Sequence, residues 1–325
     1  MRPFEYSSVT DLDTATRSAA TGTLIAGGTT LVDLMKLNVM TPNQVIDIAQ
    51  LPLRGIRLTD AGGLTIGALE TMAEVAANSD VQTRFPVIAQ ALLLSASAQL
   101  RNMASIGGNL MQRTRCAYFR DVTRPCNKRQ PGSGCPALNG QNRMHAILGT
   151  RDSCCATHPS DLAVALVALG ATIQLTGPGS NREIPLQEFY LLPGETPERE
   201  HAIQPGEIIS QVNVPSVPGG ERSVYLKIRD RASYEFALTS AAVILDMNGS
   251  QIRSARIAVG GVGTKPWALP AVAAALQGQT ASREVFSQAA RLARNGARPL
   301  RYNAFKVDLL ERTVNRALKQ AANLA

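Results

Sequence analysis

All five cysteines of this 325-residue chain lie between Cys116 and Cys155, and the rest of the sequence contains none. The surrounding stretch, residues 111–157, is rich in arginine, proline and glycine, which is typical of irregular loops. It also carries eight basic and two acidic residues, a net charge of +6 out of the chain's formal +8. Thiolates gathered in such a loop usually hold a metal or a cluster, so this segment constrains what the chain folds around.

The local nature of the charge excess argues against a nucleic-acid-binding protein. Outside residues 111–157 the chain is nearly neutral, and aromatic residues make up only 4% of it, so stacking surfaces for bases are scarce. No apolar run approaches the ~18 residues of a membrane helix. The N-terminus lacks the apolar core of an export signal. We therefore expect no nucleic-acid partner, no direct membrane insertion and no signal peptide.

Short strands and helices alternate through the first part of the chain. The patterns predict strands at residues 23–26, 45–48, 64–67, 171–175 and 208–214, and helices at 31–37, 87–98 and 162–169. Thr71 and Glu74 fit a capping box that opens another helix. Proline and glycine crowd residues 215–220. We place a domain boundary there, which gives domains 1–217, with the insert 111–157, and 218–325.

The second domain has a different pattern. Residues 224–228, 241–247 and 251–259 read as an antiparallel meander, and Asn248-Gly249 is the expected hairpin turn between the last two strands. Residues 283–323 show helical spacing throughout. The sequence therefore predicts an α+β protein whose smaller C-terminal domain combines an antiparallel sheet with helices.

Two glycine pairs suggest a phosphate-binding site. Gly27-Gly28 follows a strand and opens a helix, where backbone N–H groups can approach a phosphate closely and two threonine hydroxyls follow. Gly107-Gly108 repeats the signal. Neither matches the Gly-x-Gly-x-x-Gly pattern of dinucleotide-binding folds, and a single Gly-Gly pair is usually just a turn.

Four ordered motifs resemble one family. Residues 26–31 (Ala-Gly-Gly-Thr-Thr-Leu), 104–109 (Ala-Ser-Ile-Gly-Gly-Asn), 159–162 (Pro-Ser-Asp-Leu) and 205–209 (Pro-Gly-Glu-Ile-Ile) occur in the order and approximate spacing seen in the FAD-binding subunits of molybdenum hydroxylases, the xanthine dehydrogenase group. The resemblance covers essentially the whole chain. It implies a vanillyl-alcohol-oxidase-type FAD-binding domain of two α/β subdomains, followed by the smaller domain.

The resemblance also implies which residues bind noncovalent FAD. The first glycine loop supplies Ala26, Gly27, Gly28, Thr29, Thr30, Leu31, Val32, Asp33 and Leu34, and the second supplies Ser105, Ile106, Gly107, Gly108 and Asn109. By the same matching, Asp161 would bind the ribityl or ribose hydroxyls, Lys227 would approach the flavin ring, and Ile208 or Ile209 would pack near the adenine or the ring. Without the family, Asp161 reads as a helix cap and Lys227 as a solvated strand end.

Four thiolates suit either zinc or an iron–sulfur cluster. Nine, eight and eighteen residues separate Cys116, Cys126, Cys135 and Cys154, and the absence of any Cys-x-x-Cys pair disfavours structural zinc. A subset of the family, which includes the flavin subunit of periplasmic aldehyde oxidoreductase, carries a similar insert around a [4Fe–4S] cluster. That resemblance implies these four cysteines as ligands, with Cys155 spare. The basic residues would offset the charge of the cluster, and their surplus would face an acidic partner or screen the route of the electrons.

As a whole, the resemblance implies an electron-transfer oxidoreductase subunit. Aldehyde oxidation would occur on a large molybdenum-cofactor subunit, and electrons would pass through a small [2Fe–2S] subunit to FAD here and then to oxygen, a quinone or a ferredoxin. The location would be periplasmic through co-export with a signal-bearing partner, with the cytoplasm as the alternative. Two other functions stay open: a stand-alone flavin oxidase and a zinc-stabilised basic binding module.

Overall fold

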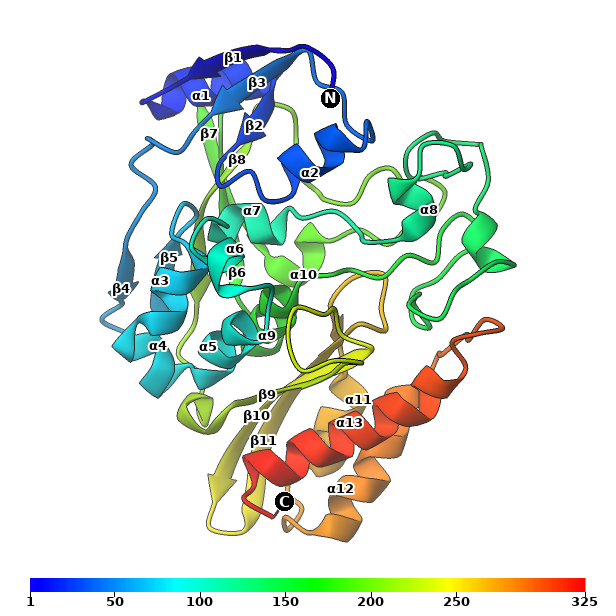
Figure 1. The fold of residues 1–325 in the computed structure, drawn as a ribbon. Coiled ribbons are helices and arrows are strands. Elements are labelled where there is room, and N and C mark those ends of the chain that lie inside the picture. The colour runs from blue at the N-terminus through cyan, green and yellow to red at the C-terminus, as the bar shows by residue number, and fades with distance from the viewer. Residues whose placement is uncertain (325) are drawn as a thin grey trace.

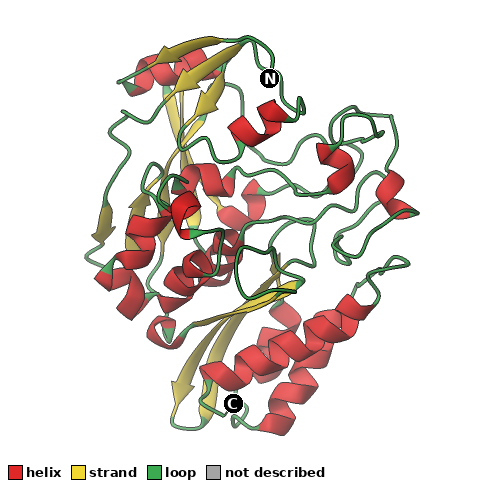
Figure 2. Ribbon diagram, in the orientation of Figure 1, coloured by secondary structure: helices red, strands yellow, loops and turns green. Residues whose placement is uncertain are grey.

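The computed structural model describes residues 1–324 and contains three β-sheets (Figures 1 and 2). The N-terminal sheet has the order β1-β3-β2, and both of its strand pairs are parallel. Its elements are β1 (Glu5–Ser8), α1 (Leu12–Ala19), β2 (Thr23–Ile25), α2 (Leu31–Lys36) and β3 (Gln44–Asp47). Parallel strands need crossover connections, which α1 and α2 provide.

The second sheet is antiparallel and has the order β4-β5-β8-β6-β7. Its strands are β4 (Ile56–Leu58), β5 (Leu64–Gly67), β6 (Thr172–Gly177), β7 (Ser180–Pro185) and β8 (Ile208–Val214). The helices of this region are α3 (Met72–Ala77), α4 (Ser79–Arg84), α5 (Pro86–Leu93), α6 (Ala98–Arg101), α7 (Ile106–Leu110), α9 (Asp161–Leu169) and α10 (Leu186–Phe189). The third sheet, β12-β11-β10-β9, is also antiparallel.

That third sheet belongs to the C-terminal part, where α11 and α13 pack on it and α12 packs on these two helices (Figure 1). The elements are η2 (Gly220–Arg222), β9 (Val224–Ile228), β10 (Thr239–Asn248), β11 (Gln251–Gly260), β12 (Trp267–Ala268), α11 (Pro270–Leu276), α12 (Arg283–Ala290), η3 (Arg291–Arg294) and α13 (Phe305–Ala321). The predicted meander and its Asn248-Gly249 turn are confirmed.

Helix α9 joins the two larger parts of the molecule. All nine of its residues are buried, and it packs on α5, β10 and β11. Its apolar composition, with Ser160 as N-cap and Gly170 in the left-handed conformation that ends it, explains a short, fully enclosed helix. Because Asp161 is the first residue of this helix, a carboxylate is carried into the interior.

The insert runs from α7 to α9 as mostly irregular chain, interrupted by α8 (Ala117–Arg120) and η1 (Pro136–Leu138). In Figure 1 it forms the green loops beside α2 and above α13. It is fastened to the C-terminal part by a bridge between Leu148 and Gly263 and by Asn303 and Lys306, whose side chains donate to the carbonyl of His145 at 3.2 and 3.1 Å. An irregular segment that is held this way is not a free arm.

Two predicted helices are wrong as continuous elements. The helix expected over 87–98 ends at Leu93, because Ala96 has φ +48° and Ser97 caps the next helix, α6. The helix expected over 283–323 is interrupted between Arg294 and Phe305. Asn303 in that interruption is fully buried and bonds to the insert. In both places a tertiary contact overrides a helical pattern.

Candidate functional site

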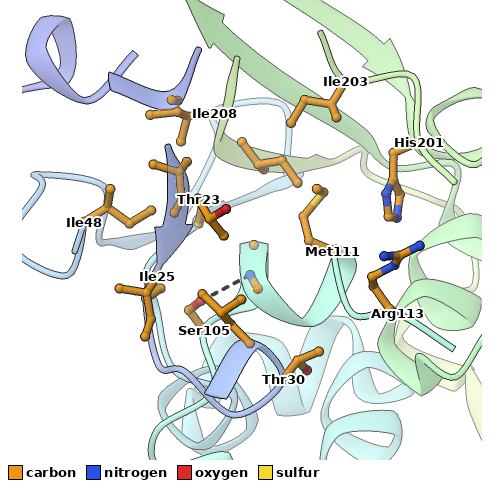
Figure 3. Close-up of a pocket in the computed structure, with 18 of the residues that line it drawn as sticks. Thr23, Ile25, Thr30, Ile48, Ser105, Met111, Arg113, His201, Ile203 and Ile208 are labelled. Atoms are coloured by element: carbon orange, nitrogen blue, oxygen red, sulfur yellow. Dashed lines mark hydrogen bonds between the residues drawn. The ribbon is translucent and has the colours of Figure 1, made fainter. Parts of the chain in front are cut away.

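A cavity of about 600 Å³ opens between the N-terminal sheet, α7 and the segment before β8 (Figure 3). Twelve of the predicted FAD residues line it: Ala26, Gly27, Gly28, Thr29, Thr30, Leu31, Leu34, Ser105, Gly107, Gly108, Ile208 and Ile209. The structure thus brings together motifs that are far apart in sequence. Val32, Asp33, Ile106 and Asn109 belong to the same two loops but do not line the cavity.

The first glycine loop is shaped by close backbone contact. A Cβ atom on Gly27 would stand 1.8 Å from the carbonyl oxygen of Met103, and Gly28 has φ +69°. Within residues 1–324, the backbone N–H groups of Gly27, Gly28, Thr29 and Thr30 donate no hydrogen bond. Because residues 27–30 line the cavity, these donors can bind an anion such as a pyrophosphate.

The second glycine loop differs in this respect. The N–H of Gly107 donates to the carbonyl of Ala68 at 2.8 Å, and that of Gly108 donates to the hydroxyl of Ser105 at 3.2 Å, the dashed line in Figure 3. Its donors are therefore used to hold the loop, and its glycines serve close packing. The first loop carries the free donors.

Asp161 and Lys227 meet outside this cavity. Lys227 Nζ lies 2.7 Å from the Asp161 carboxylate, and the exposed fractions of the two side chains are 1% and 7%. Tyr225 donates to the other carboxylate oxygen at 2.6 Å, and the Ser95 hydroxyl lies 2.9 Å from the first. Asp161 lines a second cavity of about 320 Å³ between the insert and the C-terminal part. The structure joins the two predicted residues to each other, and of the two only Asp161 lines the second cavity.

Several residues that line the large cavity belong to none of the sequence motifs. Met111, Arg113, Glu200, His201 and Ile203 line it, and Figure 3 shows Arg113 and His201 side by side on one wall. Arg113 stood out only as part of the basic excess. Burial lowers the pKa of His201 to about 4, so its ring is neutral near pH 7.

The four predicted cysteine ligands line one small cavity within the insert, together with His145 and Lys128. Among residues 1–324, however, no three Cys, His, Asp or Glu side chains are grouped closely enough to hold a single metal ion. Cys116 Sγ lies 3.2 Å from His145 Nε2, and burial raises the pKa of its thiol to about 12. The Cys116 thiol is therefore protonated near pH 7 and would lose its proton on binding a metal.

Cys154 and Cys155 point to different environments. Cys154 lines the cysteine cavity, and the N–H of Ala156 lies 3.5 Å from its sulfur. Burial raises its pKa, and the ammonium group of Lys128 opposes part of the rise. Cys155 is fully buried and does not line the cavity; its thiol hydrogen-bonds to Cys135, which lowers the pKa of Cys135 to about 6.

The basic residues of the insert mostly bind other parts of the chain. Arg115 and Arg120 pair with Asp33, Arg113 and Lys128 pair with Glu200, and Arg143 pairs with Asp230. Arg129 donates to backbone carbonyls within the insert. Much of the basic charge is thus paired within the chain. The role of any surplus charge toward an acidic partner or the route of the electrons stays a prediction.

Family comparison identifies both parts of the chain. Residues 2–217 match the FAD binding domain in molybdopterin dehydrogenase, and residues 224–321 match the CO dehydrogenase flavoprotein C-terminal domain. The chain belongs to the FAD-binding subunits of the molybdenum hydroxylases. It is therefore an oxidoreductase subunit that binds FAD, and the predicted family and fold class are confirmed.

Individual relatives agree with this family. The chain is 46% identical to the aldehyde oxidoreductase FAD-binding subunit PaoB of Escherichia coli K12, over 99% of both chains. It is 26% identical to the carbon monoxide dehydrogenase medium chain of Afipia carboxidovorans, over 92% of this chain and 90% of the relative. Among solved structures, reconstituted CO dehydrogenase from Oligotropha carboxidovorans matches with a TM-score of 0.77 and 23% identity, over 100% of this chain and 99% of that one.

No helix in the described part of the chain combines the length and apolarity needed to cross a bilayer.

Proposed function

We propose that this chain is the electron-transfer subunit of a molybdenum-dependent aldehyde oxidoreductase. It takes electrons from [2Fe–2S] clusters of a small partner subunit and delivers them to an external acceptor, while a large molybdenum-cofactor subunit oxidises the aldehyde. The observation that carries this proposal is the meeting of two glycine loops at one cavity in a member of this family. The 46% identical relative is the FAD-binding subunit of an aldehyde oxidoreductase, which supports an aldehyde as the substrate of the complex.

Bound FAD would supply the change from one-electron to two-electron transfer. The N–H groups of residues 27–30 would bind its pyrophosphate, because these residues line the cavity and their N–H groups have no other partner within residues 1–324. Ile208 and Ile209 offer an apolar wall for one of its ring systems. Asp161, which lines the second cavity, would hold polar groups at the flavin end, with Lys227 as its buried partner.

A test of this role compares the assembled enzyme with the isolated chain. We expect the isolated chain to hold FAD and to oxidise no aldehyde, and the complex with large and small subunits to oxidise aldehydes with an added acceptor. Turnover of aldehydes by the isolated chain would contradict the proposal and favour a stand-alone flavin oxidase. Screening oxygen, a quinone and a ferredoxin with the complex identifies the acceptor.

We further propose a [4Fe–4S] cluster on Cys116, Cys126, Cys135 and Cys154. All four line one cavity. Backbone N–H groups lie near the sulfurs of Cys116, Cys135 and Cys154, and such hydrogen bonds to sulfur are typical of iron–sulfur sites. In a cubane each thiolate binds its own iron, so the sulfurs stand farther apart than around one zinc ion. The donor set therefore fits the cluster better than a single ion.

Iron and acid-labile sulfide measurements test the cluster. We expect about four of each per chain, and loss of both in Cys154→Ser but not in Cys155→Ser, the adjacent matched control. Zinc without sulfide would refute the cluster. Iron loss in Cys155→Ser alone would reverse the ligand assignment.

We propose a periplasmic location reached by co-export with a signal-bearing partner. Fractionation of cells that make the whole complex, and of cells that make this chain alone, tests this. Periplasmic recovery only with the partner supports it, and cytoplasmic recovery in both cases contradicts it.

A further inference from the structure

Glu200 stands between the FAD cavity and the cysteine cavity. It lines the FAD cavity, and its carboxylate lies 3.2 Å from the Arg113 guanidinium and 3.1 Å from Lys128 Nζ. Lys128 in turn lines the cysteine cavity. A single carboxylate thus connects the walls of the two cavities through one lysine.

The three groups are well enclosed. The exposed fractions of the side chains are 14% for Glu200, 25% for Arg113 and 10% for Lys128. Lys128 is also fixed by a 2.8 Å hydrogen bond to the carbonyl of Pro197, just before Glu200 in sequence. Burial opposes ionisation of Glu200, but the two cations outweigh it and hold its pKa below the usual range. Removing the partners of an enclosed carboxylate destabilises the protein much more than breaking an ion pair on the surface does.

A second contact joins the insert to helix α2, which follows the first glycine loop. Asp33, on α2 directly after the first glycine loop, accepts from Arg115 at 3.3 Å and from Arg120. Four basic residues of the insert therefore bind two carboxylates that flank the cavity. The insert cannot shift as a body without disturbing both contacts.

We propose that Glu200 is a positioning residue that makes order in the FAD pocket and order in the cysteine insert depend on each other. FAD holds the segment that carries Glu200 against the glycine loops, and Glu200 holds Lys128 and Arg113 of the insert. Because coupling between two sites is reciprocal, whatever orders the insert also strengthens FAD binding. The inference rests on FAD binding and not on the identity of any metal in the insert.

Hydrogen exchange of the full chain, with and without FAD, tests this directly. FAD is expected to slow exchange in residues 114–157, none of which lines the FAD cavity. Glu200→Gln is expected to abolish that protection and to weaken FAD binding by about tenfold. Glu207→Gln is the matched control. Glu207 lines the same cavity and is paired, at 2.6 Å, with Arg182, which lies outside the insert, so the protection of the insert should persist.

A double-mutant cycle supplies the second readout. Lys128→Met and Glu200→Gln should each weaken FAD binding, and the double variant should be no weaker than about the worse single variant, because both remove one connection. Protection of the insert by FAD in Glu200→Gln equal to wild type would overturn the inference. So would an unchanged FAD dissociation constant in Glu200→Gln, or strictly additive losses in the cycle. The visible circular dichroism of bound FAD reports whether each variant still forms a native pocket.

Discussion

The buried pair of Asp161 and Lys227 gives the sharpest energetic prediction. At 2.7 Å the two charges attract by about 6 kcal/mol for an effective dielectric constant of about 20. Desolvation of both groups cancels much of this, so the net value of the intact pair is small. Removing one partner is different, because it leaves the other charge buried and unpaired.

We therefore expect Asp161→Asn and Lys227→Met each to lower the free energy of unfolding by about 3–5 kcal/mol. This is a large fraction of the roughly 5–15 kcal/mol that stabilises a typical domain. The double variant should lose at least about 2 kcal/mol less than the sum of the single losses, because neither charge is then left alone. Asp308→Asn removes half of an exposed pair with Arg294 and should change little.

Urea unfolding followed by far-ultraviolet circular dichroism and by the fluorescence of the single tryptophan, Trp267, measures these values. The same variants are then titrated with FAD. Losses that simply add in the double variant would refute the reasoning, since they would mean that the two charges act independently.

Two other predictions concern the glycine loop and acid stability. Gly27→Ala should abolish measurable FAD binding, since its Cβ would lie 1.8 Å from the Met103 oxygen and force two backbone segments apart. Gly108→Ala should retain FAD, because its Cβ meets only the Ser105 hydroxyl, at 2.9 Å. Equal binding by both variants in a fluorescence titration would contradict this. Burial lowers the pKa values of His145, His158 and His201 to about 4, 3 and 4, from 6.5. Below pH 6.5 the unfolded chain binds protons that the folded chain does not, so the free energy of unfolding should fall toward pH 4 by up to about 4 kcal/mol per pH unit. His158→Phe should remove about a third of that slope, which unfolding at several pH values measures. An unchanged slope in this variant would argue against a buried neutral His158.

Local signals in the sequence predicted much of the fold. The strand at 64–67, the Thr71–Glu74 capping box and the Asn248-Gly249 hairpin are all present, because each depends on neighbours only a few residues away. Strands β1 and β4 were not predicted. β1 is exposed throughout and β4 has only three residues, so neither carries a pattern long enough to mark a strand.

The site was predictable only where a motif marks it. The glycine loops and the cysteines are visible in the sequence, but Glu200 and His201 lie in an irregular segment with no pattern of its own. Their importance comes from contacts with Arg113 and Lys128, roughly seventy to ninety positions away. The break at Ala96, which leaves Ser95 beside Asp161, likewise follows from a tertiary contact that no local pattern encodes.

The order of strands in the second sheet has a consequence for how the protein is made. Strand β5 pairs with β8, and β8 also pairs with β6, so the sheet cannot close until residues 208–214 have been synthesised. Such distant pairings form slowly. The insert, with its five thiols, leaves the ribosome before β8 does. Until Glu200 has also been synthesised, the insert lacks the contacts that Arg113 and Lys128 make with it. Loading of metal or flavin before release would therefore meet an open site, and thiol oxidation would compete at the same stage.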